Sequence, residues 1–341
     1  MRPPLRQRRL LFGTACLLLA SAASAAGLGL DLQVRWPPVA LGGTLYLFGE
    51  EGRVQVLSPG EAAPQCSTAR LEPAAAPVSC AGAVWVVDGK GLLWRMEAGL
   101  PKIEGDGFEG AVALLPGRPR PAVLCRDRLV LPSGDVRPLS FSPVSAQALG
   151  DGGWWVRGAG EAARFGPEGD LRWTWTPRKG SPESAVLAGD RIITGTSSGA
   201  LVALRDRDGR FILKYRTGGA LTGPPVASGG LVFFATSNHF LRAMRASGQV
   251  VWHYRTEGRP DFGPWKTPQG LLLAEAAGDR LVLLSPVDGK VLWTWRCPEG
   301  SLLVEPVLEG SRVWVLAWGD SRTPTLHAVD LPPALPQGAP K

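Results

Sequence analysis

The chain has 341 residues, of which 45% are hydrophobic, and it carries a formal net charge of +7 at neutral pH. Four arginines lie within the first nine residues, so the charge of the remaining chain falls by four to about +3. Acidic and basic residues are interspersed there, which excludes a basic stripe for nucleic acid, and 44 Gly with 31 Pro predict many turns and few long helices.

The N-terminal segment has the three parts of a secretory signal peptide. Arginines 2, 6, 8 and 9 precede an apolar run from Leu10 to about Ala20, and small residues follow as far as position 26. An uncleaved membrane anchor is the less favoured alternative, because the apolar run is short for a membrane span. We therefore predict a signal peptide over residues 1–26 and an exported protein of the periplasm or cell envelope.

Cys16 raises the question of a lipid anchor. Only a short apolar run precedes it, so the match to a lipid-attachment motif is poor and we expect no anchor there. No later run reaches 18 apolar residues, so no transmembrane helix is expected after removal of the signal.

Four cysteines follow the signal segment: Cys66, Cys80, Cys125 and Cys297. Export permits disulfides, and Cys66 and Cys80 are close enough in sequence to pair. Buried free thiols are an equally good interpretation, because sequence does not fix connectivity.

The C-terminal half repeats itself with a period near 40 residues. The first strand residues of four successive copies are Arg191, Leu231, Leu271 and Arg312. One copy divides into short strands at residues 223–228, 231–236, 240–245 and 249–254, rich in β-branched and aromatic residues and bounded by glycine turns. This period and pattern predict the four-stranded blades of a β-propeller.

One large apolar position, tryptophan in three of four cases, also recurs in the fourth strand of the copies. It is occupied by Trp173, Leu213, Trp252 and Trp293. A large flat side chain at this place suits packing against the next blade.

Weaker copies fill the N-terminal half. They are Pro37–Ser58, Ala76–Glu97, a degenerate Arg120–Ser140, and Gln147–Trp175. We therefore predict an all-β, eight-bladed propeller in one domain over residues 27–333, followed by a flexible tail at residues 334–341. Seven blades is the alternative, because the third unit is poor.

The two ends of the repeat region complement each other. The last copy stops after its third strand, and the segment Leu30–Trp36 resembles a fourth strand with no partner before it. We predict that this N-terminal strand completes the last blade and closes the ring, which removes two open sheet edges.

The stretches "GALVALRDRDGRFILKYRTGG" and "LVLLSPVDGKVLWTW" resemble the repeats of the PQQ-like, or quinoprotein-alcohol-dehydrogenase-like, propellers. The resemblance is specific from about Ser181 to Leu331. Arg205, Arg245 and Ser285 stand where the family pattern prefers Asp, and only Asp330 keeps it. The resemblance implies an eight-bladed propeller, but a fold alone does not choose a function.

The family has two branches. The dehydrogenases use PQQ and Ca²⁺, are much longer, and carry a vicinal cysteine pair that this chain lacks. The other branch is non-enzymatic and similar to BamB, a scaffold in the insertion of outer-membrane β-barrel proteins. The resemblance therefore favours a monomeric, non-enzymatic scaffold without a cofactor, whose partner is a cell-envelope protein, with the barrel-assembly machinery as the specific candidate. A reduced quinoprotein with PQQ or another small ligand in its funnel is the alternative, and a polysaccharide-binding module is a third.

No motif predicts catalytic, cofactor-binding or metal-ligating residues. His239, His253 and His327 are the only histidines, and none has a second histidine at metal-binding spacing. The G-x-S-x-G match at residues 195–199 is followed by a strand and not by the helix that a nucleophile elbow needs. Asp206 and Asp208 lack the further oxygen ligands of a calcium loop, which predicts a solvated turn. A carboxylate pair assembled from distant blades stays open.

One stretch, residues 259–267, carries the residue types that anchor protein interfaces. Arg259, Phe262 and Trp265 are the candidate interface residues. The alternative interpretation is an aromatic plug that closes the central funnel.

Overall fold

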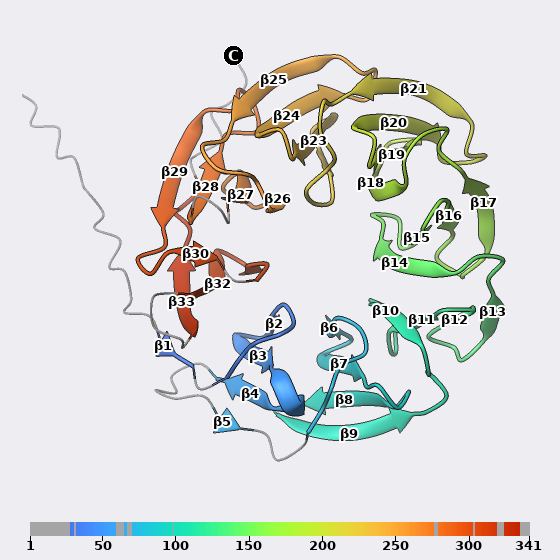
Figure 1. Ribbon diagram of the computed structural model, residues 1–341, viewed down its shortest axis with the longest axis vertical. Coiled ribbons are helices and arrows are strands. Elements are labelled where there is room, and N and C mark those ends of the chain that lie inside the picture. Colours follow the sequence, from blue (N-terminus) through green and yellow to red (C-terminus); the bar gives the residue numbers. More distant parts are fainter. Residues whose placement is uncertain are drawn as a thin grey trace, which may run out of the picture.

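The computed structural model describes residues 28–30, 32–58, 65–66, 70–97, 99–275, 279–302, 304–318 and 324–334. Eight β-sheets stand around a central axis (Figure 1). This is the predicted all-β, eight-bladed propeller, and the seven-bladed alternative is wrong. The predicted signal peptide, Cys16 and residues 335–341 of the predicted tail lie outside the described residues.

In each of the first seven blades the strands follow one another as an antiparallel meander from the centre outwards. Blades 1 to 3 consist of β2 (Val39–Leu41), β3 (Thr44–Phe48), β4 (Val54–Leu57), β5 (Gln65–Cys66); β6 (Val78–Cys80), β7 (Ala83–Val87), β8 (Leu93–Glu97), β9 (Leu100–Gly105); and β10 (Ala111–Leu115), β11 (Ala122–Cys125), β12 (Arg128–Val130), β13 (Val136–Pro138). Blades 4 and 5 consist of β14 (Pro143–Ala148), β15 (Trp154–Gly158), β16 (Ala162–Phe165), β17 (Leu171–Trp175); and β18 (Pro182–Ala188), β19 (Arg191–Thr196), β20 (Ala200–Arg205), β21 (Phe211–Arg216).

Blades 6 and 7 consist of β22 (Val226–Ser228), β23 (Leu231–Thr236), β24 (Phe240–Arg245), β25 (Val250–Arg255); and β26 (Phe262–Lys266), β27 (Leu271–Glu275), β28 (Arg280–Leu284), β29 (Val291–Arg296). Blade 8 contains β30 (Ser301–Leu302), β31 (Val307–Glu309), β32 (Arg312–Trp318), β33 (Pro324–Asp330) and β1 (Leu28–Gly29). A single 3₁₀ turn, Glu50–Gly52, is the only helical element in the described part of the chain.

The N-terminal strand closes the ring, as predicted, but at a different place. β1 pairs antiparallel with β33, the last strand of the chain. The predicted closing segment, residues 30–36, instead carries Leu30, Leu32 and Val34 into the core between blades 8 and 1. The apolar side chains of this segment therefore fill the junction, while its backbone links the two blades. The Leu30 N–H donates to the Pro324 carbonyl in blade 8 at 2.9 Å, and Val34 forms an isolated antiparallel bridge with Gly49 at the end of β3 in blade 1.

The degenerate third unit is a complete blade whose first strand lies before the predicted unit. β10 (Ala111–Leu115) pairs with β11 across a loop at residues 116–121. That loop contains three prolines and a glycine, which interrupt the repeat pattern and hide the strand that precedes them.

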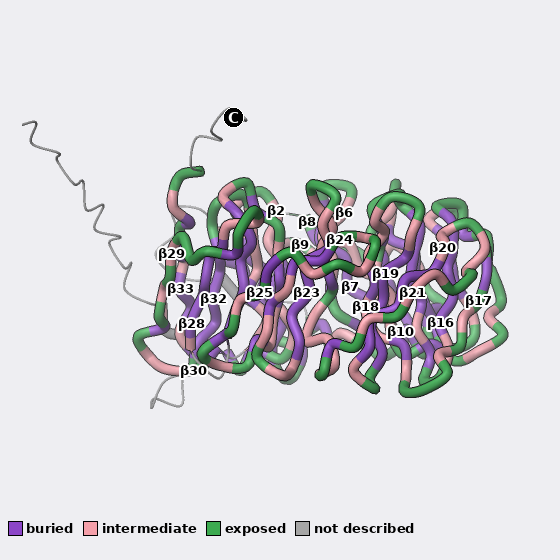
Figure 2. Tube along the Cα trace, turned by 90° about the horizontal axis from the view of Figure 1, so that it is seen from above, coloured by how far each residue is buried: buried purple, intermediate pink, exposed green. Residues whose placement is uncertain are grey.

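Buried side chains fall into eight clusters, one at each junction between neighbouring blades. Figure 2 shows the same arrangement, with buried strand segments between two exposed rims of loops. The middle strands of the blades are covered on both faces, which explains why they contain continuous apolar runs, whereas outer strands such as β9 and β13 are largely exposed. No helix in the described part of the chain is long and apolar enough to cross a membrane.

Candidate functional site

The three residues predicted as an interface lie at the start of blade 7. Phe262 and Trp265 belong to the inner strand β26, where both are half-buried and pack against the core between blades 7 and 8. Arg259 precedes the strand, is exposed, and holds its Nε 3.1 Å from Asp261 Oδ1. The structure thus brings the two aromatic residues together in a core and leaves Arg259 at the surface. Their role as an interface stays a prediction.

Trp265 has a hydrogen-bond partner inside the protein. Burial raises the pKa of the Glu305 carboxyl, and a hydrogen bond from the Trp265 side chain opposes that rise. Glu305 lies just before β31, so this contact joins blade 7 to blade 8. Trp265 therefore contributes to the packing of blade 7 against blade 8.

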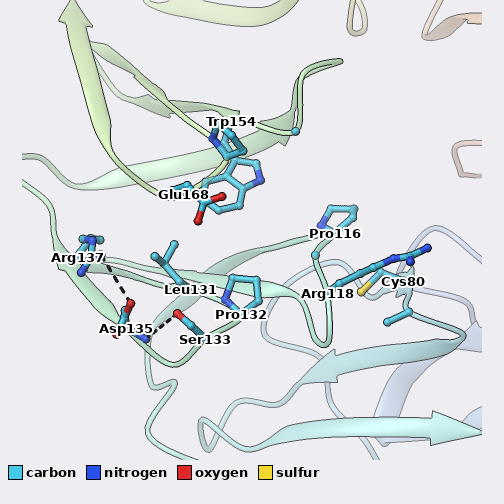
Figure 3. Close-up of a pocket in the computed structure, with 14 residues that line it drawn as sticks. Cys80, Pro116, Arg118, Leu131, Pro132, Ser133, Asp135, Arg137, Trp154 and Glu168 are labelled. Atoms are coloured by element: carbon cyan, nitrogen blue, oxygen red, sulfur yellow. Dashed lines mark hydrogen bonds and ion pairs between the residues drawn. The ribbon is translucent and has the colours of Figure 1, made fainter.

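A cleft of about 770 Å³ opens where loops of blades 2, 3 and 4 meet (Figure 3). Apolar surface comes from Pro116, Leu131, Pro132 and Trp154, and charge comes from Arg118, Arg137, Asp135 and Glu168. Figure 3 shows Arg137 and Asp135 at one end and Arg118 with Cys80 at the other. The cleft therefore combines a proline-rich wall with charges of both signs.

The polar groups of this cleft are unequally satisfied. Arg137 lies 3.7 Å from Asp135, whereas Arg118 has no ion pair among the described residues. The indole Nε1 of Trp154 is buried and has no hydrogen-bond partner in the described chain. Burial raises the pKa of Cys80, against a hydrogen bond from the backbone of Gly117, so its thiol is protonated at neutral pH. Because the thiolate is the nucleophile, this cleft suits binding better than covalent chemistry.

A second depression, the basic groove, lies between the outer parts of blades 4 and 5. We define it by Trp175, Arg178, Lys179, Phe211 and Lys214, and its volume is about 400 Å³. Phe211 is 63% exposed although it is a large apolar side chain. No carboxylate lines the groove, and none of its three cations has an ion pair among the described residues. The groove therefore presents uncompensated positive charge beside exposed aromatic surface.

Sequence reasoning did not find this groove. Its cations come from the loop after β17 and from β21, so they are separated by some 35 residues in the chain. Each of them alone looks like an ordinary solvated charge. The one available signal is Phe211, an aromatic residue on an outer strand next to a turn.

Asp206 has a structural role that the sequence did not indicate. Arg164 on β16 is fully buried, and its Nε lies 2.8 Å from Asp206 Oδ1 in the next blade. Arg164 also pairs with Asp151 in its own blade. Burial raises the pKa of Asp151, but the hydrogen bond and charge of Arg164, together with the backbone N–H groups of Gly153 and Asp151, lower it by more, so the net pKa is below its ordinary value. Asp206, which the sequence placed in a solvated turn, therefore forms an ion pair that joins blades 4 and 5. We call Arg164, Asp151 and Asp206 the clamp.

The chain has recognisable relatives. A family model described as "Outer membrane protein assembly factor BamB" matches residues 158–263 and 241–331, which together cover just over half of the chain. A protein of the same description from Nitrosomonas eutropha (strain DSM 101675 / C91 / Nm57) is 30% identical over 105 residues. That match covers 31% of this chain and 25% of the relative, so the similar segment spans about a quarter of the relative's length.

Solved structures share the architecture. The computationally designed Ika8 protein superposes with a TM-score of 0.70 at 9% identity, covering 90% of this chain and 98% of that one. Sqt1 from Saccharomyces cerevisiae superposes with a TM-score of 0.67 at 11% identity, covering 91% and 99%. At such identities the likeness shows the fold alone.

Proposed function

Because the chain belongs to the family whose model is described as outer membrane protein assembly factor BamB, we propose that it is an exported, non-enzymatic scaffold in the cell envelope. It binds a protein partner and acts in outer-membrane protein assembly. The observation that carries this proposal is the family match, which extends from the end of β15 to the end of blade 8. The signal-like N-terminus supports export.

The basic groove is the surface that we assign to the partner. All five of its residues fall within the segment that the family model matches. Unpaired cations around an exposed aromatic side chain suit an acidic peptide segment that carries an apolar residue, because charge attracts the segment and the apolar contact holds it. Charges of this kind mainly change the association rate and its dependence on salt.

The test is capture of partners from crosslinked, detergent-solubilised native envelopes with the tagged mature chain. Enrichment of an outer-membrane barrel-assembly protein supports the scaffold, and loss of that protein with Lys179→Glu plus Lys214→Glu supports the groove. The matched control is Lys90→Glu plus Arg126→Glu, two exposed cations outside the groove and outside residues 259–267, without an ion pair in the described chain. Equal capture of the partner by both double variants would support the scaffold function and contradict the assignment of the basic groove as its binding surface.

The same capture experiment tests the predicted interface at blade 7 with the single variant Arg259→Glu. Replacing Phe262 or Trp265 would disturb the core between blades 7 and 8, so loss of capture would not be informative. Loss of the partner with Arg259→Glu but not with the groove variant moves the interface to blade 7.

Binding of a small ligand is the second candidate function, and the cleft in Figure 3 favours it. Its volume lies within the range of about 300–1,000 Å³ that is typical of ligand pockets. The Trp154 N–H and the Arg118 guanidinium, which have no partner within the described part of the chain, are further candidate binding groups. Native mass spectrometry of the purified protein, with an absorbance spectrum for a quinone, tests this candidate. A bound small molecule together with no captured protein would replace the scaffold proposal.

A further inference from the structure

Three potential metal ligands meet at the junction of blades 7 and 8. Cys297 follows β29, Glu299 lies two residues further along the turn, and His327 is on β33. Their ligand atoms all lie within 4.8 Å of one another. His327 Nε2 is 2.6 Å from Glu299 Oε2, and Cys297 Sγ is 3.6 Å from the same oxygen. In Figure 1 the strands β29 and β33 that bring these residues together belong to neighbouring blades.

We propose that Cys297, Glu299 and His327 form a three-ligand binding site for Zn²⁺. Thiolate sulfur, imidazole nitrogen and carboxylate oxygen are the ligand types that zinc takes in proteins. Zinc–ligand distances of about 2.0–2.3 Å place tetrahedral ligand atoms roughly 3.3–3.7 Å apart. The sulfur–oxygen separation already fits, and the nitrogen–oxygen pair has to open by less than about 1 Å.

The surroundings hold the three side chains in place. Cys297 and His327 are 4% and 3% exposed, while the Glu299 side chain is 29% exposed and provides a route from solvent. The backbone N–H of Cys297 donates to the Asp279 carbonyl at 2.8 Å. The His327 ring lies 5.6 Å from the ring of Trp295, which limits its rotation. Packing of this kind orients metal ligands.

The repeat provides an internal comparison at the junction of blades 4 and 5. The motif Trp-Thr-Trp occurs in both β17 and β29, which aligns Pro177 with Cys297 and Lys179 with Glu299. Strand register aligns Val202 with His327. None of these counterparts is a metal ligand, so the three donors at blades 7 and 8 are not part of what the repeat needs to fold.

Zinc binding would link the turn that follows β29 in blade 7 to β33, the strand that pairs with β1 and closes the ring. β33 pairs with β1, so a metal held by Cys297 and His327 fastens blade 7 to the blade that closes the ring. In the binding step the thiol proton is released to solvent and a zinc–sulfur bond replaces the S–H bond. Zinc that binds only the folded state raises the free energy of unfolding by an amount that grows with the logarithm of the free zinc concentration above Kd, because the unfolded chain does not hold the three ligands together.

The experiment uses the purified mature chain, treated with a chelator and titrated with Co²⁺ as a spectroscopic probe. The expected result is one equivalent bound, with a thiolate-to-cobalt charge-transfer band and the visible bands of tetrahedral cobalt, all abolished by Zn²⁺. Cys297→Ser removes the charge-transfer band, and His327→Gln lowers affinity at least tenfold. Cys125→Ser, which changes another buried free cysteine, leaves the spectrum unchanged.

If His327→Gln does not fold, Glu299→Gln replaces it, since that side chain is partly exposed. Zn²⁺ should also raise the melting temperature of the unaltered chain and of Cys125→Ser, but not of Cys297→Ser. Absence of a cobalt spectrum in the folded chain, or its persistence in Cys297→Ser, overturns the site.

Discussion

The indole of Trp252 lies against Gly289, the turn glycine of the next blade. A Cβ atom at Gly289 would come within 2.6 Å of that ring, and Trp252 Nε1 donates a hydrogen bond to the Pro286 carbonyl at 3.1 Å. Trp173 and Gly209 repeat the relationship two blades earlier, where a Cβ atom at Gly209 would come within 2.7 Å of the Trp173 ring. The outer strand of one blade is therefore fitted to a hairpin turn of its neighbour, which explains why tryptophan and turn glycine recur together.

This contact makes Gly289→Ala more damaging than an ordinary glycine replacement. Gly289 has φ +72, where an L-residue costs about 1–2 kcal/mol, and the new methyl group must also displace the indole. We expect a loss of about 3 kcal/mol in the free energy of unfolding, measured by chemical denaturation. The control is Gly230→Ala, with φ +75 and open space around it, which should lose only about 1 kcal/mol. Equal losses would contradict the importance of the tryptophan contact.

The repeat made most of the fold predictable, because turn residues recur at corresponding positions of each copy and mark where its strands begin and end. The strands predicted at residues 231–236 and 240–245 coincide with β23 and β24, since glycine and asparagine turns bound both. Closure of the ring followed from a missing strand at one end and a spare strand at the other. The sequence did not predict that the closing strand β1 lies two residues before the expected segment. Alternating apolar residues are equally typical of a strand and of a segment whose side chains pack between two blades.

The candidate sites were less predictable than the fold. The basic groove, the clamp at Arg164 and the three donors around His327 each combine residues from two blades. Residues so far apart in sequence carry no common spacing from which a motif is recognisable. Trp265 shows the opposite difficulty, because a tryptophan near prolines resembles an interface residue although its indole is used inside the protein.

In the clamp at Arg164, we expect removal of a carboxylate to lower stability more than removal of the arginine charge. Asp206→Ala leaves a fully buried guanidinium with one carboxylate fewer, and we expect a loss of about 3 kcal/mol. Arg164→Met removes the buried charge itself and should change stability by only about 1 kcal/mol. The double variant should resemble Arg164→Met, and a double-mutant cycle from denaturation curves measures the coupling. Additive losses would show that the two residues act independently.

The same clamp gives a pH dependence with a defined sign. Burial raises the pKa of Asp151, but Arg164 and the backbone N–H groups of Gly153 and Asp151 together outweigh it, so the folded-state pKa is below its ordinary value of 3.8. Its stabilising contribution is therefore complete above pH 3.8 and is lost as the pH falls through the folded-state value. Denaturation midpoints measured from neutral pH downwards should therefore fall for the unaltered chain relative to Arg164→Met as the pH drops below 3.8. A constant difference at all pH values would exclude Asp151 as the group responsible.

Ring closure depends on the segment that follows β1, and Leu32 tests it. Leu32 is 2% exposed, belongs to the core between blades 8 and 1, and fills the space beside Gly49. Leu32→Ala should lower the free energy of unfolding by about 2–5 kcal/mol through the cavity it leaves. Because the same segment positions β1 on β33, we also expect the edge of β33 to be uncovered and the protein to associate at high concentration, seen by light scattering.

The matched control for this last change is Leu100→Ala on the outer strand β9. Leu100 is 76% exposed, so its truncation should change stability by less than about 0.5 kcal/mol and leave the protein monodisperse. If Leu32→Ala loses stability but stays monodisperse, the segment fills the junction without controlling the pairing of β1. If it behaves like Leu100→Ala in both measurements, the last blade holds together without the N-terminal segment, and closure by β1 is not what secures the ring.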